Sequence, residues 1–185
     1  MISFSFGLKG KPSKFPKIRQ EIKEAIHAGI LLFAAANNDG GHSRRTYPAS
    51  HGAGVFCIHA ATGEGNKASY NPTQLAREDN YMMIGDNILS CWPSETQANA
   101  TKYMSGTSFA TPVAVSIAAF MISLVTTKLP QHTTWTHHPK SYEGMKMIFR
   151  MLSEERDSYD WVNFPGYLHQ HDEDKVLQDI QELLE

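Results

Sequence analysis

A serine with small neighbours stands out among the residues that could do chemistry. Ser108 lies in the stretch Ser105-Gly-Thr-Ser-Phe-Ala-Thr-Pro112, between a polar loop and a long apolar segment. The first backbone N–H groups of a helix have no partners inside it, and the positive end of the helix dipole lies there. A serine at that position could act as a nucleophile, because the neighbouring N–H groups would stabilise the oxyanion formed on attack. The common alternative is that Ser108 only caps the helix.

An asparagine is the second candidate for the same chemistry. Asn38 follows the apolar run of residues 30–36, inside a turn that is rich in asparagine and glycine. Functional groups of parallel α/β sheets lie at the carboxyl ends of strands, and an asparagine amide placed there could donate a hydrogen bond to an oxyanion. Asn38 could equally be a turn former, since asparagine tolerates positive φ angles.

The elements expected to position these two residues alternate between strands and helices. Residues 2–6 alternate apolar side chains with serines, as a strand does, and the apolar spacing after Pro16 predicts a helix that ends at Gly29. Residues 30–36 are apolar on both faces, which is typical of a parallel strand covered by helices. This βαβ pattern predicts an α/β fold with a mainly parallel sheet and helices on both faces.

Further elements follow from the same patterns. Strands are expected over residues 54–60, 81–84 and 88–91, and helices over residues 141–152 and 174–184. Residues 92–101 read as a polar loop before a buried helix that starts near Ser108, with Pro112 in its first turn. The continuous apolar part of that helix runs only from Val113 to Val125, shorter than the roughly 20 residues of a membrane span.

The composition excludes several other kinds of function. Lys and Arg total 17 and Asp and Glu total 19 among 185 residues, so the net charge is −2. This balance predicts neither nucleic acid nor a membrane as a partner. Cys57 and Cys91 are too few for a disulfide-rich scaffold or a four-cysteine zinc site, and they favour an intracellular setting, although one disulfide stays open. The histidines near residues 137–138 and 169–174 read as solvated loops, so no metal is expected.

Together, four motifs resemble the C-terminal half of the catalytic domain of a subtilisin-like serine peptidase. Residues 106–112 resemble the nucleophile motif of that family, with its serine at Ser108, and residues 33–40 resemble the strand and turn that carry its oxyanion asparagine, at Asn38. Ser5-Phe6-Gly7 resembles the segment that pairs with the substrate backbone. Tyr47-Pro48-Ala49 resembles the loop beside the pocket for the residue before the scissile bond.

The resemblance implies a serine endopeptidase acting on peptide or protein substrates, without a cofactor. It also implies that Ala35, Ala36 and Asn37 line the specificity pocket, where small residues leave room for a sizeable side chain. The resemblance covers about residues 1–128, and residues 129–185 look like a helical C-terminal extension.

One part of the family pattern has no counterpart in this chain. The triad of the family runs Asp, His, Ser, and its first two members lie upstream of the segment that residues 1–6 resemble. We therefore expect the N-terminal part of the fold to be missing, the Asp and His to lie upstream in a longer chain with other domains, and this segment alone to be nearly inert.

Two alternative readings of the same motifs remain. The chain could be a catalytically inert, truncated or degenerate module that binds peptides or packs against another domain. Residues 106–110 also come close to the Gly-x-Ser-x-Gly elbow of α/β-hydrolases, which requires a strand directly before its serine. Residues 94–104 read as polar and irregular, so the elbow is set aside.

Overall fold

The centre of the molecule is a six-stranded sheet. The computed structural model describes residues 1–76, 78–94, 99–129 and 135–185. The strands lie in the order β1-β2-β3-β4-β8-β7, and every neighbouring pair is parallel except β7 and β8. Their bounds are Ile2–Phe4 for β1, Leu32–Ala35 for β2, Val55–Ala61 for β3, Tyr81–Ile84 for β4, Ser153–Arg156 for β7 and Tyr159–Val162 for β8.

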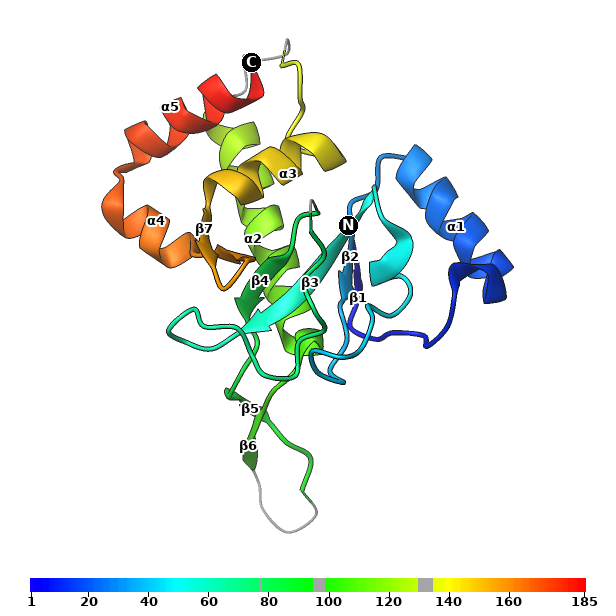
Figure 1. The fold of residues 1–185 in the computed structure, drawn as a ribbon. Helices are drawn as coiled ribbons and strands as arrows, with labels where there is room; N and C mark the ends of the chain where they lie inside the picture. Colours follow the sequence, from blue (N-terminus) through cyan, green and yellow to red (C-terminus); the bar gives the residue numbers. More distant parts are fainter. Residues whose placement is uncertain (77, 95–98, 130–134) are drawn as a thin grey trace.

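Helices cover both faces of this sheet (Figure 1). They are α1 (Pro16–His27), α2 (Thr107–Lys128), α3 (Tyr142–Met151), α4 (Phe164–Gln170) and α5 (Glu173–Leu184), with short 3-10 helices at Pro12–Lys14 and Ala49–His51. On one face α1 inserts Ile22 into a cluster with Leu32. On the other face α2, α3 and α5 pack against Phe33 and Phe56. The α/β fold with a mainly parallel sheet and helices on both faces is confirmed.

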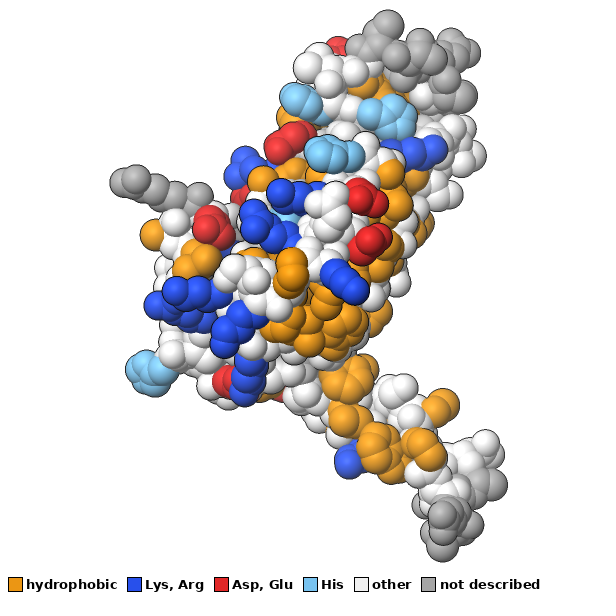
Figure 2. All heavy atoms as spheres, turned by 90° about the vertical axis from the view of Figure 1, so that its right-hand side faces the viewer, with side chains coloured by type: hydrophobic (Ala, Val, Ile, Leu, Met, Phe, Trp, Pro, Cys, Tyr) orange, Lys and Arg blue, Asp and Glu red, His pale blue; other side chains and the backbone are white. Residues whose placement is uncertain are grey.

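A hairpin leaves this body as an arm (Figure 1 and Figure 2). It consists of β5 (Ile88–Cys91) and β6 (Thr101–Met104), paired antiparallel, and its Leu89 and Tyr103 are 51% and 60% exposed. The sequence predicted β5 but treated β6 as irregular loop, which was wrong. Because the arm packs on no core, the residues of β6 carry no apolar alternation that would reveal a strand.

The missed strand changes the argument about the hydrolase elbow. β6 ends shortly before Ser108, so the lack of a preceding strand was the wrong reason to set that motif aside. β6 pairs only with β5 and lies outside the six-stranded sheet, however, whereas the elbow projects from a strand of the central sheet. The elbow therefore still does not fit.

Helix α2 is the central helix of the core. It begins at Thr107, so Pro112 lies inside the helix and not in its first turn, which corrects the sequence prediction. By length and composition alone α2 could cross a membrane. Its buried residues, among them Ala114 and Met121, belong instead to the cluster that fills one face of the sheet. This packing favours the expected role of a core helix.

The segment after α2 contributes strands as well as helices. The sequence predicted only helices for residues 129–185, but β8 pairs with β4 and β7 pairs with β8 in the main sheet. These strands have four residues each and mixed polarity, so their sequence gives little periodic signal. Met145 and Ile148 of α3 share one core with Phe33. A domain boundary at residue 128 stays a prediction.

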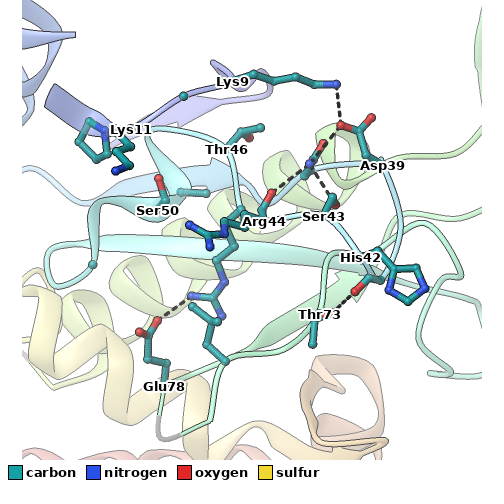
Figure 3. A pocket seen from close by; sticks show the side chains of 18 residues that line it. Lys9, Lys11, Asp39, His42, Ser43, Arg44, Thr46, Ser50, Thr73 and Glu78 are labelled. Carbon is teal, nitrogen blue, oxygen red and sulfur yellow. Dashed lines mark hydrogen bonds and ion pairs between the residues drawn. The ribbon is translucent and has the colours of Figure 1, made fainter. Parts of the chain in front are cut away.

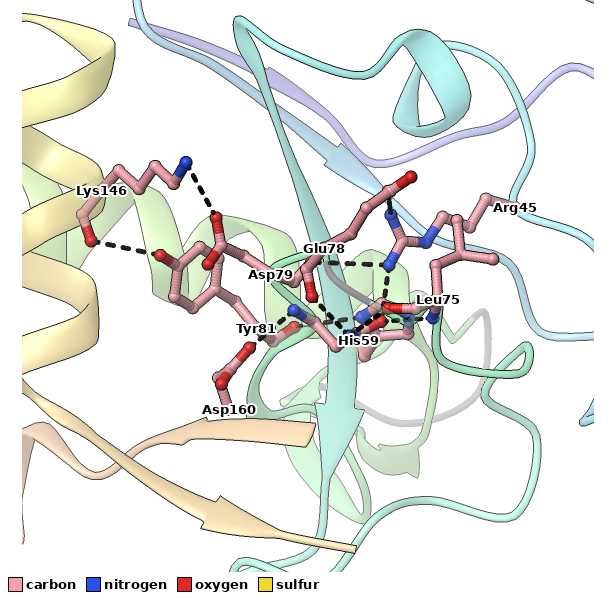
Figure 4. Close-up of polar contacts among 9 residues, drawn as sticks. Arg45, His59, Leu75, Glu78, Asp79, Tyr81, Lys146 and Asp160 are labelled. Atoms are coloured by element: carbon pink, nitrogen blue, oxygen red, sulfur yellow. Dashed lines mark hydrogen bonds and ion pairs between the residues drawn. The ribbon is translucent and has the colours of Figure 1, made fainter. Parts of the chain in front are cut away.

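Polar contacts also tie this segment to β4 (Figure 4). Asp79 forms ion pairs with Lys146 at 3.4 Å and with Arg150 at 2.6 Å. The hydroxyl of Tyr81 donates to the carbonyl of Lys146 at 3.1 Å, and Asp160 accepts a hydrogen bond from the backbone of Asn80 at 2.6 Å. These contacts hold α3 and β8 against the strand that they cover.

A buried histidine on β3 predicts sensitivity to acid. His59 is fully buried, its Nδ1 lies 3.2 Å from the carbonyl oxygen of Tyr81, and its ring packs edge-on against Tyr159. Burial is the main reason, and the charge of the nearby Arg45 the second, that the pKa of His59 is lowered from 6.5 to about 3. The folded state therefore binds fewer protons than the unfolded state between these two pKa values, so stability falls as the pH falls through this window.

We expect the free energy of unfolding to be about 2 kcal/mol lower near pH 5 than near pH 7.5 through His59 alone. Urea unfolding at several pH values measures this difference. His59→Leu should remove that part of the pH dependence, whereas His27→Gln on the exposed end of α1 should leave it unchanged. An equal loss of stability in wild type and His59→Leu would show that other groups cause it.

Candidate active site

Asn38 is docked against the start of α2. Its Oδ1 accepts a hydrogen bond from the backbone N–H of Thr107 at 2.8 Å, and its own N–H donates to Oδ1 of Asn37 at 2.7 Å. Within the described part of the chain, the side-chain Nδ2 of Asn38 makes no hydrogen bond. Because the oxygen is engaged and the side chain is exposed, the amide hydrogens of Asn38 are free to bind another acceptor.

Ser108 follows Thr107 in the first turn of α2 and is half-buried. Neither its N–H nor its Oγ has a hydrogen-bond partner among the described residues, so no imidazole or carboxylate of that part of the chain contacts the hydroxyl. Gly106 allows the side chain of Asn38 to lie close to the start of α2, since a Cβ at position 106 would lie 3.2 Å from Nδ2 of Asn38. The structure thus brings together Asn38 and Ser108, the two residues for which the sequence predicted chemistry.

A turn that the sequence analysis did not include in the site supports this arrangement. Gly85 accepts a hydrogen bond from the N–H of Gly106 at 2.8 Å, and the N–H of Asn87 donates to Oγ of Ser105 at 2.9 Å. A Cβ at Gly85 would lie 2.8 Å from that of Ala110, so only glycine fits. The residues of this turn, Gly85-Asp-Asn87, are a typical turn sequence, but no local pattern predicts their contact with the start of α2.

The segment expected to pair with substrate lies on the surface. Ser5, Phe6 and Gly7 are exposed, with Phe6 at 55%. Gly7 lies directly against the side chain of Thr46, which leaves no room for a Cβ. The next residue, Leu8, exchanges two backbone hydrogen bonds with Tyr47, at 2.8 and 3.0 Å. The segment is therefore fixed at its C-terminal end, at Leu8, and its residues 5–7 are open to solvent.

A cavity of about 930 Å³ lies beside the turn of Asn38 (Figure 3). Asn37 and Asp39 line it, as do Lys9 and Arg44, whereas Asn38 and Ser108 do not. Of the other residues expected at a specificity pocket, Ala35 and Ala36 are buried and do not line this cavity. The loop expected beside the pocket contributes Ala49 to the lining, whereas Tyr47 and Pro48 are buried. Tyr47 stacks on Phe15 with the ring centres 5.9 Å apart, because this loop closes the core beneath α1.

Asn37 organises the rim of this cavity. Its Nδ2 donates to the carbonyl of Arg44 at 3.0 Å and to Oγ of Ser43 at 3.2 Å, and it lies 3.4 Å from Oδ2 of Asp39. Lys9 forms an ion pair with Asp39 at 2.6 Å, and its hydrogen bond is the main reason that the pKa of Asp39 is lowered. One side chain therefore holds both the turn before Asn38 and the loop of Arg44.

Other candidate centres are not formed in the described ranges. No three His, Cys, Asp or Glu residues come together there as metal ligands. Cys57 is buried and Cys91 is exposed, and both are free thiols. The docked pair of Asn38 and Ser108 is accordingly the arrangement on which a catalytic hypothesis can be built.

Comparison with known proteins identifies relatives of this chain. The family model described as the subtilase family matches residues 1–150. The subtilisin-like protease het-Q2 of Podospora anserina is 31% identical over 127 residues, which cover 68% of this chain and 34% of that protein. Subtilisin DY of Bacillus licheniformis is 30% identical over 117 residues, covering 62% and 40%. The chain therefore spans well under half the length of these relatives.

Solved structures show the same fold. The prenylagaramide maturation protease PagA superposes with a TM-score of 0.69 at 22% identity, over 100% of this chain and 62% of that one. The patellamide maturation protease PatG gives a TM-score of 0.65 at 19% identity, over 89% of this chain and 49% of that one. At these identities the likeness extends to the fold alone.

Proposed function

Since the chain belongs to the subtilase family, we propose that it is the nucleophile-bearing part of a serine endopeptidase. In this proposal Ser108 attacks the peptide bond, and Asn38 donates a hydrogen bond to the oxyanion that forms. The Asp and His of the triad come from a segment upstream of these residues in a longer protein. The substrates are peptides or proteins.

One observation carries the proposal most directly. The carboxamide of Asn38 is anchored through its oxygen to the N–H of Thr107 at 2.8 Å, next to Ser108. This contact leaves the amide hydrogens of Asn38 and the N–H of Ser108 as free donors at the start of one helix, where the dipole is positive. Free donors held in place before the reaction are what stabilises a developing oxyanion.

The proposed reaction follows from these donors. Oγ of Ser108 attacks the peptide carbonyl carbon, and the upstream His accepts the hydroxyl proton and passes it to the leaving amine. Asn38 and the N–H of Ser108 hold the oxyanion of the tetrahedral intermediate. A water molecule then attacks the acyl carbon. The His accepts the proton of that water and passes it to Oγ of Ser108, which releases the carboxylic acid product. Residues 5–7 are exposed and can add a substrate strand through backbone hydrogen bonds.

A non-catalytic function is the second candidate. Within the described ranges no base contacts Oγ of Ser108, and a serine without a base is a poor nucleophile near neutral pH. The 185-residue segment alone is therefore expected to be nearly inert, and a degenerate module could still bind peptides or pack against another domain.

Labelling with a fluorophosphonate probe separates the two candidates. We expect the full-length protein to form one adduct, located on Ser108 by mass spectrometry, and Ser108→Ala to form none. Ser123→Ala, on an exposed position of the same helix, is the matched control and should label like wild type. An unlabelled full-length protein would contradict the peptidase and support the inert module.

A further inference from the structure

The cavity beside Asn38 is lined by more cations than anions (Figure 3). Charged side chains from three loops line it, and so does His42. The cations are Lys9, Lys11, Arg44 and Arg45, and the anions are Asp39 and Glu78. If every charge counts equally, the lining carries a net charge of 4 − 2 = +2 while the whole chain carries −2. The cavity is thus positive against the trend of the molecule.

Both acids of the lining already have a partner. Asp39 is 2.6 Å from Nζ of Lys9, and Glu78 is 2.9 Å from Nη1 of Arg45. The side chain of Arg45 is only 6% exposed, and its second amino group donates to Oδ1 of Asn80 at 2.6 Å. Arg45 is therefore part of the structure and is not free to bind a ligand.

Two cations are left over. Lys11 and Arg44 form no ion pair with any acid in the described part of the chain, and both are exposed. The backbone carbonyl of Arg44 accepts a hydrogen bond from Asn37, which fixes where this side chain leaves the loop. Ser50 lines the same space with a hydroxyl group that can donate a hydrogen bond to an anion, whereas the hydroxyl of Ser43 already donates to the carbonyl of Gly40 at 2.7 Å. The free groups of the cavity are thus suited to one carboxylate.

The position of the cavity indicates where that carboxylate comes from. Its lining joins residues 9–12, which directly continue the segment proposed to hold the substrate, to the turn at Asn37 and Asp39. A substrate carbonyl whose oxygen reaches Asn38 belongs to the residue before the scissile bond. Because Asn37 and Asp39, the two neighbours of Asn38, line the cavity, we expect the side chain of that same residue to reach it.

We propose that this cavity is the specificity pocket and that it selects an acidic side chain, Asp or Glu, immediately before the scissile bond. Lys11 and Arg44 are the residues that determine this preference. The proposal rests on the proposed function for the direction in which the substrate lies. It keeps Asn37 of the expected lining, which was Ala35, Ala36 and Asn37, but not the two alanines, whose side chains are buried.

Peptide binding tests the proposal without turnover. The full-length protein carrying Ser108→Ala is titrated with blocked fluorescent peptides that differ only in Glu, Gln or Lys at the residue before the scissile bond. We expect the Glu peptide to bind about five- to tenfold more tightly than the Gln peptide at low salt, as two exposed charges together allow. Added salt should reduce the difference.

Variants assign the preference to its residues. Lys11→Gln together with Arg44→Gln should bring the Glu and Gln peptides to equal affinity, and Arg44→Glu should favour the Lys peptide. Lys17→Gln, on the exposed side of α1, is the matched control and should keep the preference for Glu. Circular dichroism and the affinity for the Gln peptide report whether each variant is folded.

Several results would overturn the proposal: equal affinity for the Glu and Gln peptides, a preference that survives in the double variant, or binding of neither peptide. Failure of the proposed function gives a different pattern. If the fluorophosphonate leaves Ser108 unlabelled while the Glu preference and its loss in the double variant are observed, the pocket assignment stands for a peptide-binding module.

Discussion

Replacing Ser108 with alanine is expected to reduce peptide hydrolysis by the full-length protein about 10⁶-fold, which is the size of the effect for the serine of subtilisin itself. In the proposed reaction the hydroxyl of Ser108 is the attacking group. The neighbouring hydroxyl of Thr107 is buried and donates to the carbonyl of Asn37 at 3.4 Å. The loss should lie in kcat, because Oγ contributes little to binding the uncleaved peptide. Hydrolysis of a chromogenic peptide measures both parameters.

The control for this variant is Ser123→Ala, which removes an exposed hydroxyl from the same helix. It should keep kcat and KM within about twofold of wild type, since surface substitutions have small effects. Residual activity above the uncatalysed rate is expected in Ser108→Ala from the oxyanion donors alone. A Ser108→Ala variant that hydrolyses peptides at the wild-type rate would place the nucleophile elsewhere.

The parts of the fold that sequence reasoning found are those with strong local patterns. Residues 30–36 and 54–60 are apolar on both faces, and only a strand between two helical layers buries both. The carboxyl end of β2 then limits where Asn38 can be. The long apolar helix α2 limits where Ser108 can be. It packs on the face of the sheet, so its first turn lies near the ends of the strands.

The parts that sequence reasoning missed depend on contacts between distant residues. Strand β6 is an exposed arm and β7 is a short polar strand, so neither carries a periodic pattern. The partner of Arg45 lies 33 residues away at Glu78, and that of Asp39 is Lys9, in the loop before α1. Which charged residues share the cavity therefore could not be predicted from the sequence, and the resemblance alone led us to expect Ala35 and Ala36 in its lining.

Replacing Asn38 is the second substitution with a large expected effect. Asn38→Ala should lower kcat of the full-length protein about 10²–10³-fold with little change in KM, as the equivalent donor does in subtilisin. The donor acts on charge that exists only in the intermediate, so its loss leaves the binding of the uncleaved peptide intact. Steady-state kinetics on the same chromogenic peptide separate the two parameters.

Asn38 also has a structural contact, which the alanine variant removes at the same time. Its Oδ1 binds the N–H of Thr107, so part of any loss in Asn38→Ala could come from a displaced start of α2. Asn38→Asp keeps an oxygen for Thr107 but has no amide hydrogen, and its negative charge opposes the oxyanion. We therefore expect Asn38→Asp to unfold at nearly the same urea concentration as wild type and to lose at least as much kcat as Asn38→Ala. Wild-type turnover in Asn38→Asp would mean that the side chain serves the docking of α2 and takes no part in catalysis.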